Sequence, residues 1–282
     1  MTLESLVRQA LDEDAAHSDI PTSVTIPSGT NGRASFLAKR DGVVAGLDVA
    51  AAVFKAVDPF LKFKKLANDG TRVPKGAVLA EVQGSLSSIL RAERVALNFL
   101  QRLSGIATET ARYLEAVSGT KAVILDTRKT TPGLRALEKY AVTMGGAHNH
   151  RMNLSDGILI KDNHIAALKA LGISLGDATR QARAKAPRDM KVEVEVTNLD
   201  EVRDALDAGA DILLLDNMPI EMMRQAVQTI GGHAKTEASG GIDLSNVRAA
   251  AETGVDFISI GALTHSVKAL DISLEFEEIL KP

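Results

Sequence analysis

The sequence contains no cysteine and no tryptophan, and its aromatic residues are seven phenylalanines and two tyrosines in 282 positions. The absence of cysteine excludes disulfides, thiolate metal sites and a cysteine nucleophile, and it is typical of the reducing cytoplasm. So few aromatic rings leave little material for stacking the bases of single-stranded nucleic acid.

An excess of charge of one sign is also missing, because 33 Lys and Arg face 36 Asp and Glu for a formal net charge of −3. General nucleic-acid and membrane-surface binders are normally basic, so neither partner is expected. No apolar run reaches about 18 residues, so we expect no membrane span. The first residues lack a basic region followed by an apolar run, so we expect no signal peptide. The composition is that of a globular protein with one large or two smaller domains.

The first 105 residues mix helices with short strands. Helical spacing of apolar residues begins at Leu3, with Thr2 as its N-cap, and a much longer helix is expected over about 86–103, ended by Gly105. Short strands are expected at 33–37 and 42–46, with a helix at 49–57.

From about residue 120 the pattern changes to short apolar runs that end in polar residues and alternate with helical stretches. These runs are 122–125, 157–160, 192–196, 211–215, 236–238 and 257–260. Continuous apolar runs suit parallel strands buried on both faces, and the alternation indicates βα units. We therefore expect a six-stranded open or closed α/β barrel. A doubly wound sheet is the alternative, but its GxGxxG fingerprint is missing.

The active site of a βα barrel lies at the carboxyl ends of its strands. The residues at these ends include Asp126, Arg128, Lys129, Lys161, Glu195, Asp216, Ser239 and Gly261. A polar residue is needed wherever a chain leaves the core, so any one of them has an ordinary structural explanation. Lys161, Glu195 and Asp216 stand out because they sit at or inside apolar runs, where long charged side chains need partners.

Residues 121–165 hold seven Lys and Arg against four Asp and Glu, a local charge of +3, and three of the six histidines. A solvated basic face is one interpretation. The cations, however, lie in loops rich in Gly, Pro, Thr and Asn. Arg and Lys together suit a ligand with several carboxylate or phosphate oxygens.

His148 and His150 could form a metal pair, since both face one way in an extended segment. The adjacent Arg151 would repel a dication, so an anion-binding role for His150 is favoured. The turns at Ser239-Gly240-Gly241 and at Gly261 suit phosphate binding by backbone N–H groups.

Two acids lie among these cations. Glu195 and Asp216 could hold Mg²⁺ or bind sugar hydroxyls. The alternative is that they are salt-bridge partners of Lys161 and Lys129.

Taken together, these segments resemble the quinolinate phosphoribosyltransferase family, also called nicotinate-nucleotide pyrophosphorylase (carboxylating). The matching stretches, in order along the whole chain, are 92–108, Asp126-Thr-Arg-Lys-Thr-Thr-Pro-Gly-Leu-Arg135, Glu138-Lys-Tyr-Ala-Val142, His148-Asn-His-Arg151, 154–157, Ile160-Lys-Asp-Asn-His164, Glu193-Val-Glu-Val196, 215–217, Glu237-Ala-Ser-Gly-Gly241 and 260–266. Pro21 departs from the family's usual pattern, in a loop of the first domain that bears on nothing catalytic.

The resemblance implies an N-terminal α/β sandwich domain at 1–105, with 266–282 packing back on it, and an open six-to-seven-stranded α/β barrel at 106–265. It also implies a cytoplasmic homodimer at least, whose active site is shared between subunits. The implied reaction joins quinolinate to phosphoribosyl pyrophosphate with Mg²⁺, and yields nicotinate mononucleotide, pyrophosphate and CO₂.

The roles of single residues follow from the same resemblance. Arg102 is the residue lent to the neighbouring subunit. The quinolinate carboxylates are implied to bind Arg128, His150, Arg151 and Lys161. The phosphoribosyl pyrophosphate and metal side is implied to be Lys129, Glu195, Asp216, Ser239, Gly240, Gly261 and His265. Lys129, Glu195 and Asp216 are the expected catalytic residues, and Glu195 and Asp216 the expected metal ligands, whether direct or through water.

Two further functions compete with this one. A Schiff-base aldolase on a βα barrel would use Lys161 as its nucleophile. A divergent relative, such as the molybdenum-transport-associated proteins of this fold, would lack the Arg128, His150 and Arg151 set, which is intact here.

Overall fold

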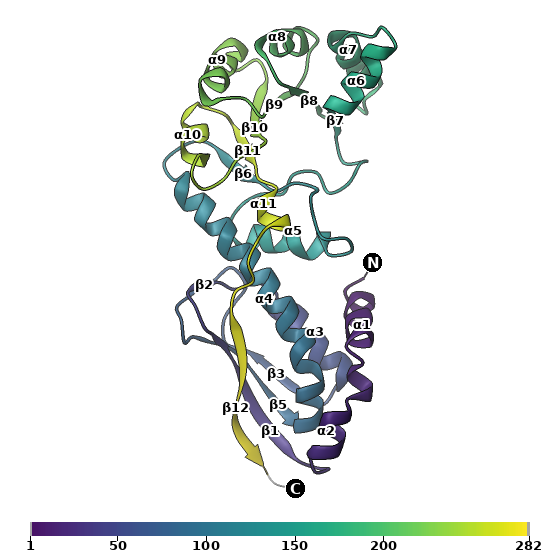
Figure 1. The fold of residues 1–282 in the computed structure, drawn as a ribbon, viewed down its shortest axis with the longest axis vertical. Helices are drawn as coiled ribbons and strands as arrows, with labels where there is room; N and C mark the ends of the chain where they lie inside the picture. The colour runs from purple at the N-terminus through teal and green to yellow at the C-terminus, as the bar shows by residue number, and fades with distance from the viewer. Residues whose placement is uncertain (1, 281–282) are drawn as a thin grey trace. The chain divides into compact units, whose positions relative to one another are not determined.

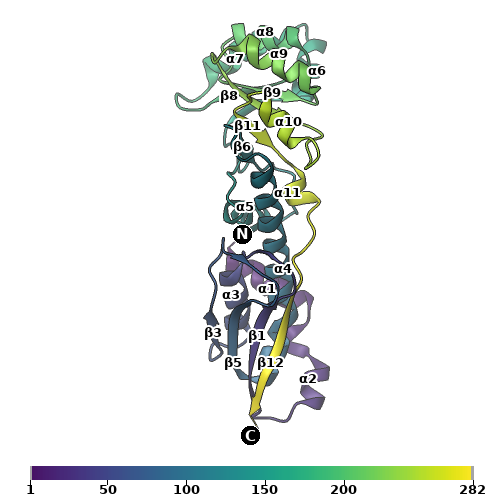
Figure 2. The ribbon, with the colours of Figure 1, turned by 90° about the vertical axis from the view of Figure 1, so that its left-hand side faces the viewer.

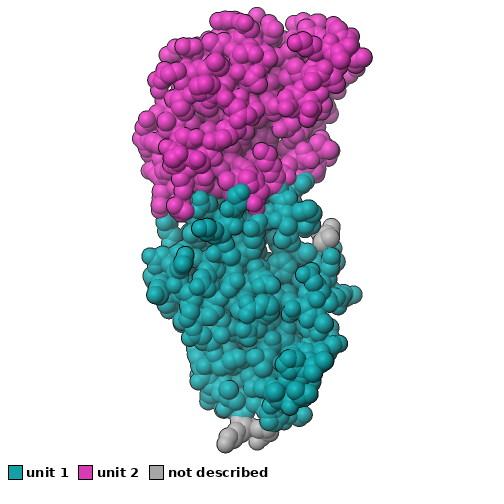
Figure 3. Space-filling model, viewed as in Figure 1, with its two compact units in different colours: residues 1–111, 130–146, 266–282 teal, residues 112–129, 147–265 magenta. Residues whose placement is uncertain are grey.

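The computed structural model describes residues 2–280 and contains two compact units, coloured separately in Figure 3. Unit 1 consists of residues 1–111, 130–146 and 266–282, and unit 2 consists of residues 112–129 and 147–265. The domain boundaries expected from the sequence stay a prediction, since compact units in space need not follow them.

Unit 1 is built on a four-stranded antiparallel sheet with the order β12-β1-β5-β3. Its strands are β1 (Asn31–Ala38), β3 (Lys62–Lys65), β5 (Val78–Ser85) and β12 (Ile272–Leu280), and a separate pair joins β2 (Gly42–Val43) to β4 (Arg72–Val73). β12 runs along β1 from Ile272, opposite Ala38, to Leu280, opposite Asn31. The end of the chain therefore completes a sheet that the first hundred residues begin.

Helices cover one face of this sheet, as Figures 1 and 2 show for α1, α3 and α4. The helices that lie in unit 1, wholly or for most of their length, are α1 (Leu3–Glu13), η1 (Ala16–Ser18), α2 (Ile20–Thr25), α3 (Leu47–Val57), α4 (Leu86–Ala116) and α5 (Arg135–Met144). Thr2 caps α1 as predicted, since its hydroxyl accepts the Ser5 N–H at 3.2 Å.

The core of unit 1 is apolar and lies between the sheet and these helices. Its centre is a trio of phenylalanines, Phe36, Phe54 and Phe63, whose ring centroids are each 5.8 Å apart. Phe36 and Phe54 are completely buried. Such burial is the main favourable term for a unit of this kind.

The predicted end of the long helix at Gly105 is wrong, because α4 continues to Ala116. A Cβ atom at Gly105 would lie 2.3 Å from the carbonyl oxygen of Lys268. Glycine is therefore needed here for the close approach of the segment that leads into β12 rather than for a helix end.

Unit 2 is an open α/β barrel, as predicted, and all six apolar runs form its parallel strands. The sheet order is β6-β11-β10-β9-β8-β7. The strands are β6 (Val123–Leu125), β7 (Ile158–Ile160), β8 (Val192–Val196), β9 (Ile212–Asp216), β10 (Lys235–Ser239) and β11 (Phe257–Ser259). A single parallel bridge from Leu125 to His148 extends the edge beyond β6, which suits the expected count of six to seven strands.

Short helices separate the strands and lie on the outside of the sheet (Figure 1). They are α6 (Asp162–Ala170), α7 (Leu175–Lys185), α8 (Leu199–Asp207), α9 (Ile220–Ile230) and α10 (Val247–Glu252). A further short helix, α11 (Ala262–His265), follows β11, the last strand of this sheet along the chain. Within residues 2–280, no helix in either unit has both the length and the apolar character of a membrane span.

Candidate active site

Strand register brings the charged residues of unit 2 onto one face. Glu195 lies opposite Leu214, and Leu214 lies opposite Glu237, so these side chains share a face of the sheet. The intervening valines of β8 are fully buried on the other face, against the helices. The two glutamates consequently point into the barrel, and Asp216 and Ser239, two residues further on, lie above them.

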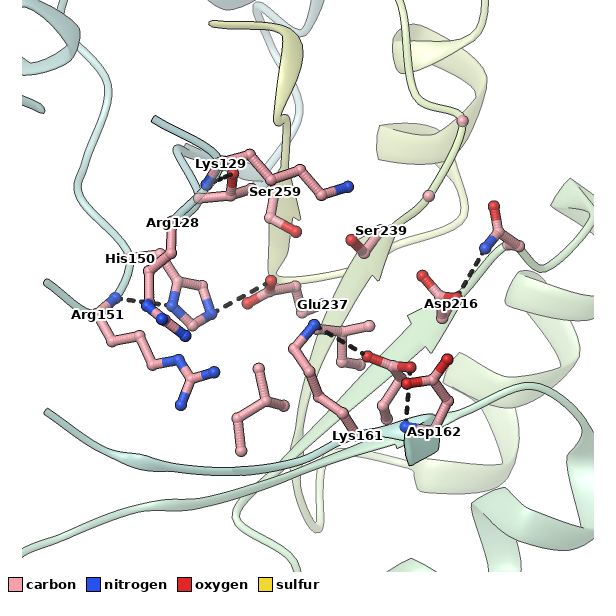
Figure 4. Close-up of a pocket in the computed structure, with 17 residues that line it drawn as sticks. Arg128, Lys129, His150, Arg151, Lys161, Asp162, Asp216, Glu237, Ser239 and Ser259 are labelled. Atoms are coloured by element: carbon pink, nitrogen blue, oxygen red, sulfur yellow. Dashed lines mark hydrogen bonds and ion pairs between the residues drawn. The ribbon is translucent and has the colours of Figure 1, made fainter. Parts of the chain in front are cut away.

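A cavity of about 550 Å³ opens at the carboxyl ends of the strands, and Figure 4 shows the side chains around it. Nine of the twelve predicted site residues line it, namely Arg128, Lys129, His150, Arg151, Lys161, Glu195, Asp216, Ser239 and Gly240. Those nine come from six separate segments of the chain. The volume is within the range usual for small-molecule sites.

Gly261 and His265 do not line the cavity but lie next to a residue that does. A Cβ atom at Gly261 would lie 3.0 Å from His265 Nε2 and 3.1 Å from Lys129 Cδ. The hydroxyl of Thr264 donates to the carbonyl of Lys129 at 2.7 Å. The turn after β11 therefore holds Lys129 along one side of its length.

Arg102 belongs to α4 in unit 1 and does not line this cavity. Its Nη2 is 2.8 Å from Oε1 of Glu138, whose side chain is completely buried. Glu138 also accepts the Thr131 N–H at 3.0 Å and the Thr131 hydroxyl at 2.8 Å. This network holds the guanidinium in one place while leaving 29% of the Arg102 side chain exposed.

Lys161 follows β7 directly and stands at the start of α6. Its ammonium lies 3.3 Å from Oε2 of Glu195, and Oε1 of Glu195 accepts the Asp162 N–H at 3.2 Å. Of the interpretations of Glu195 given above, the salt bridge to Lys161 is therefore the one that the structure shows. The ammonium of Lys129, in contrast, makes no hydrogen bond or ion pair with any of residues 2–280.

A tight turn holds Asp216 on the opposite side of the cavity. The Asn217 amide donates to Oδ2 of Asp216 at 2.7 Å, and the Asn217 N–H donates to the Ser239 carbonyl at 2.9 Å. Asn217 has φ +52° and Gly240 has φ +81°. A Cβ atom at Gly240 would lie 2.4 Å from Oδ1 of Asn217, so only glycine fits beside this turn.

Arg128 and Arg151 bring two guanidinium groups to the same end of the cavity (Figure 4). Burial, together with the positive charge of Arg128, lowers the pKa of Arg151. Two cations held this close repel each other, and a bound anion would relieve that repulsion.

His150 lies between these arginines and two buried carboxylates. Its Nε2 is 3.3 Å from Oε2 of Glu193 and 3.5 Å from Oε1 of Glu237, and its Nδ1 accepts the Arg151 N–H at 2.7 Å. Burial alone lowers the pKa of His150, but the two carboxylates raise it to about 10. A pKa of about 10 would put a second proton on Nδ1 at neutral pH, but Nδ1 accepts the Arg151 N–H, and an accepting ring nitrogen carries no proton. The two observations disagree, and the 2.7 Å contact corresponds to the neutral ring, with its one proton on Nε2.

The backbone around His150 is fixed from below by Asp126, which is completely buried at the end of β6. Its Oδ1 accepts the His150 N–H at 2.8 Å. Asp126 thus orients the loop that carries the cations.

Glu193 and Glu237 have no role in the sequence-based prediction. Glu193 is 5% exposed and Glu237 is 1% exposed, and burial raises the pKa of Glu193. The alternation of side chains along a strand could have identified Glu193. Glu193 precedes Glu195 by two residues in one strand, so the two side chains face the same way. Glu237 needs the register of β10 against β9 as well.

Two groups of residues could hold a metal ion. Asp216 and Glu195 offer carboxylate oxygens to the cavity, which suits Mg²⁺, although Lys161 already pairs with Glu195. The second group is His150, Glu193 and Glu237, whose ligand atoms lie within 4.8 Å of one another. Its nitrogen ligand is less suited to Mg²⁺, and His148 does not belong to it.

Comparison with protein families covers nearly the whole chain. Residues 19–104 match the family model described as the N-terminal domain of quinolinate phosphoribosyl transferase, and residues 106–275 match that of its C-terminal domain.

Named relatives match over similar lengths. A nicotinate-nucleotide pyrophosphorylase (carboxylating) of Mycobacterium leprae is 46% identical, with 95% of both chains covered. A chloroplastic protein of the same name from Arabidopsis thaliana is 45% identical over 98% of this chain and 83% of its own. The crystal structure of NadC from Streptococcus pyogenes has a TM-score of 0.91 and 44% identity, covering 99% of this chain and 96% of that one.

Proposed function

The chain belongs to the quinolinate phosphoribosyltransferase family, and we propose that it transfers phosphoribose from phosphoribosyl pyrophosphate to quinolinate. The products are nicotinate mononucleotide, pyrophosphate and CO₂, a step in the synthesis of NAD. The observation that carries this proposal is the convergence of five basic side chains on one cavity that also has a glycine turn and four acidic residues along its wall.

The quinolinate carboxylates fit the end of the cavity that holds Arg128 and Arg151. Guanidinium groups bind carboxylates with paired hydrogen bonds, and the mutual repulsion of the two arginines ends when an anion enters. Lys161 reaches the same space from α6, and His150 lies behind the arginines. Arg102 is the fourth cation for this substrate, supplied by a second copy of the chain.

Phosphoribosyl pyrophosphate fits the other end, between Lys129 and the turn at Ser239 and Gly240. Backbone N–H groups at such turns bind phosphate oxygens. Lys129, whose ammonium is without a protein partner among residues 2–280, is placed to neutralise the leaving pyrophosphate. Gly261 and His265 contribute by packing beside Lys129.

The reaction needs charge stabilisation more than proton transfer. Positive charge grows on the ribose ring as the bond from C1 to pyrophosphate breaks, and the carboxylates of Glu195 and Asp216 stabilise it. The pyridine nitrogen then bonds to C1 and becomes cationic. That cation stabilises the carbanion left when the adjacent carboxylate departs as CO₂, and the carbanion takes up a proton.

Mg²⁺ is the metal that this chemistry calls for, and Asp216 and Glu195 are the residues that would hold it, either directly or through water. When bound, it would offset the negative charge of the pyrophosphate. Removal of divalent metal with a chelator should therefore abolish turnover, and added Mg²⁺ should restore it.

The direct test supplies quinolinate, phosphoribosyl pyrophosphate and Mg²⁺ to the purified protein and measures nicotinate mononucleotide and CO₂. Equal amounts of both are expected. Product from nicotinate but none from quinolinate would overturn the proposal. Borohydride trapping of a substrate adduct on Lys161 would favour the aldolase instead.

We also propose a homodimer at least, with each active site completed by Arg102 of the other subunit. Arg102→Ala and Lys129→Ala dimers should each be inactive. Mixing them should restore up to about a quarter of the activity, because one of the two hybrid sites then holds both intact residues. No recovery after subunit exchange verified by mass spectrometry would contradict the shared site.

We place the protein in the cytoplasm, on the strength of its lack of cysteine. Cell fractionation that recovers it with an organelle, the location in the name of the Arabidopsis relative, would contradict this placement.

A further inference from the structure

Two glutamates that contact His150 lie in the interior of the barrel, and one of them, Glu237, also lines the cavity. Glu193 on β8 and Glu237 on β10 both face inward, and the His150 ring reaches between them with Nε2 at 3.3 and 3.5 Å. Figure 4 shows this ring with Glu237 on one side and Arg151 on the other. The cluster is formed by residues distant in sequence, so only the folded barrel assembles it.

Both nitrogens of the His150 ring are already engaged by the protein. Nε2 carries the proton and faces the two carboxylates, while Nδ1 accepts the backbone N–H of Arg151. A ring held at both nitrogens has no N–H left to offer a substrate carboxylate. What the ring does offer is a rigid link from the barrel floor to the peptide of Arg151.

The carboxylates themselves are poorly suited to stabilising the fold. Oε1 of Glu193 is buried and has no hydrogen-bond partner within the described part of the chain, and Oε1 of Glu237 has only its 3.5 Å contact with Nε2 of His150. Burying a carboxylate oxygen without such a partner is costly, and a hydrophobic residue or a neutral amide would be cheaper in stability. Unpartnered buried polar atoms in a native site call for a functional explanation.

We propose that Glu193 and Glu237 are positioning residues that hold the His150 ring and, through it, aim Arg151 at the substrate carboxylates. This inference rests on the proposed function, because it takes quinolinate as the ligand of Arg151. It also changes the role of His150, from a direct donor to the substrate into the link between the two glutamates and the arginine.

The link predicts an effect on one substrate only. Arg151 lies at the quinolinate end of the cavity, whereas phosphoribosyl pyrophosphate is bound at the other end by Lys129 and the turn at Gly240. Loss of a residue that orients a ligand-binding side chain weakens binding by about 10- to 100-fold in metal sites, where such partners have been measured. We expect the lower end of this range, because the arginine itself remains.

The experiment compares Glu193→Gln and Glu237→Gln with Glu221→Gln, an exposed glutamate on α9 that serves as the matched control. Each of the first two variants should raise KM for quinolinate about tenfold, leave KM for phosphoribosyl pyrophosphate within twofold and leave the melting temperature unchanged or higher. The Glu221→Gln variant should match wild type. An equal rise in both KM values, or none, overturns the proposal.

A second set of variants tests whether the glutamates act through the histidine. In a His150→Asn background, Glu237→Gln should have no further effect on KM for quinolinate, because the link is already broken. A full additional tenfold rise would show that Glu237 acts independently of His150 and would overturn the positioning role.

The ring itself gives a readout that a merely structural role would not move. In ¹⁵N-histidine spectra, the His150 signals, assigned by their loss in His150→Asn, should show a proton on Nε2 and none on Nδ1. Glu193→Gln should change these signals. Unchanged signals with unchanged KM would overturn the inference, while wild-type protein that makes no nicotinate mononucleotide would overturn the proposed function instead.

Discussion

The two units of this chain use their buried positions in opposite ways. The sheet of unit 1 turns apolar side chains inward, and its core is a continuous cluster around Phe36 and Phe54. The sheet of unit 2 buries the valines of β8 on its outer face, beneath the helices, and places Glu193, Glu195 and Glu237 on its inner face beside Leu214.

This difference separates stability from chemistry. An apolar core lowers the free energy of the folded state, whereas buried carboxylates raise it unless they are fully paired. Charged residues are tolerated inside unit 2 because its parallel strands end together at one edge, where polar ligands can neutralise them. Substitution of an inward-facing residue should therefore lower the stability of the fold in unit 1 and the activity in unit 2.

The largest effect on stability should come from Phe36→Ala in unit 1. Removing a fully buried phenylalanine costs about 3–5 kcal/mol, because it leaves a cavity against Phe54 and Phe63. Denaturant unfolding measures this loss. Phe60→Ala is the matched control, since Phe60 is 88% exposed. A loss below about 1 kcal/mol for Phe36→Ala would break the comparison.

Lys129→Ala and Lys161→Ala in unit 2 should reduce turnover about 10²- to 10³-fold while the unfolding transition stays near wild type. Both ammonium groups face the cavity, so their loss removes charge that the reaction needs. Steady-state kinetics with quinolinate and phosphoribosyl pyrophosphate checks this. Lys169→Ala, in an exposed position on α6, should be fully active. Near-normal activity in both cavity variants would contradict the site.

Gly240→Ala should weaken phosphoribosyl pyrophosphate binding and cost about 1–2 kcal/mol of stability through its left-handed backbone. The added Cβ would collide with Asn217, which holds Asp216. Gly172→Ala carries the same strain at φ +73° but meets nothing within 4 Å. Only Gly240→Ala should raise KM for phosphoribosyl pyrophosphate, and equal KM values in the two variants would contradict the turn's role.

The smallest effect concerns Asp256, outside the cavity. Burial raises its pKa, but donors on Lys235, Thr236 and Lys121 outweigh this and lower it to about 2. The resulting stability, about 1 kcal/mol after solvent screening, is fully present above pH 4 and is lost as pH falls towards 2. Asp256→Asn should remove this pH dependence. Asp200→Asn, an exposed control, should leave it intact.

Much of the fold was predictable because its signals are local. Each of the six apolar runs forms a strand of the barrel, and Thr2 caps the first helix. Gly105 shows the limit of that logic. A glycine near the end of an apolar pattern is locally a stop signal, but here it admits the segment at Lys268, more than 150 residues later.

The site divides in the same way. Nine predicted residues line one cavity, and most of them lie at or just after the end of a strand, which the sequence marks by an abrupt change from apolar to polar residues. His150 and Arg151 are the exceptions, since they follow only the isolated bridge at His148. Glu237 was not given a role, because its partner His150 is 87 residues away and its position depends on the pairing of β10 with β9.

The sequence by itself determined which segments become strands and which cations stand at their ends, since both depend on neighbours within a few residues. Only the tertiary structure decided what those ends face. Parallel register places Glu195, Leu214 and Glu237 in one layer, and the β6 edge brings His150 above them. A charge in a sequence is only a residue type. Its pKa and its partner come from the strands folded beside it.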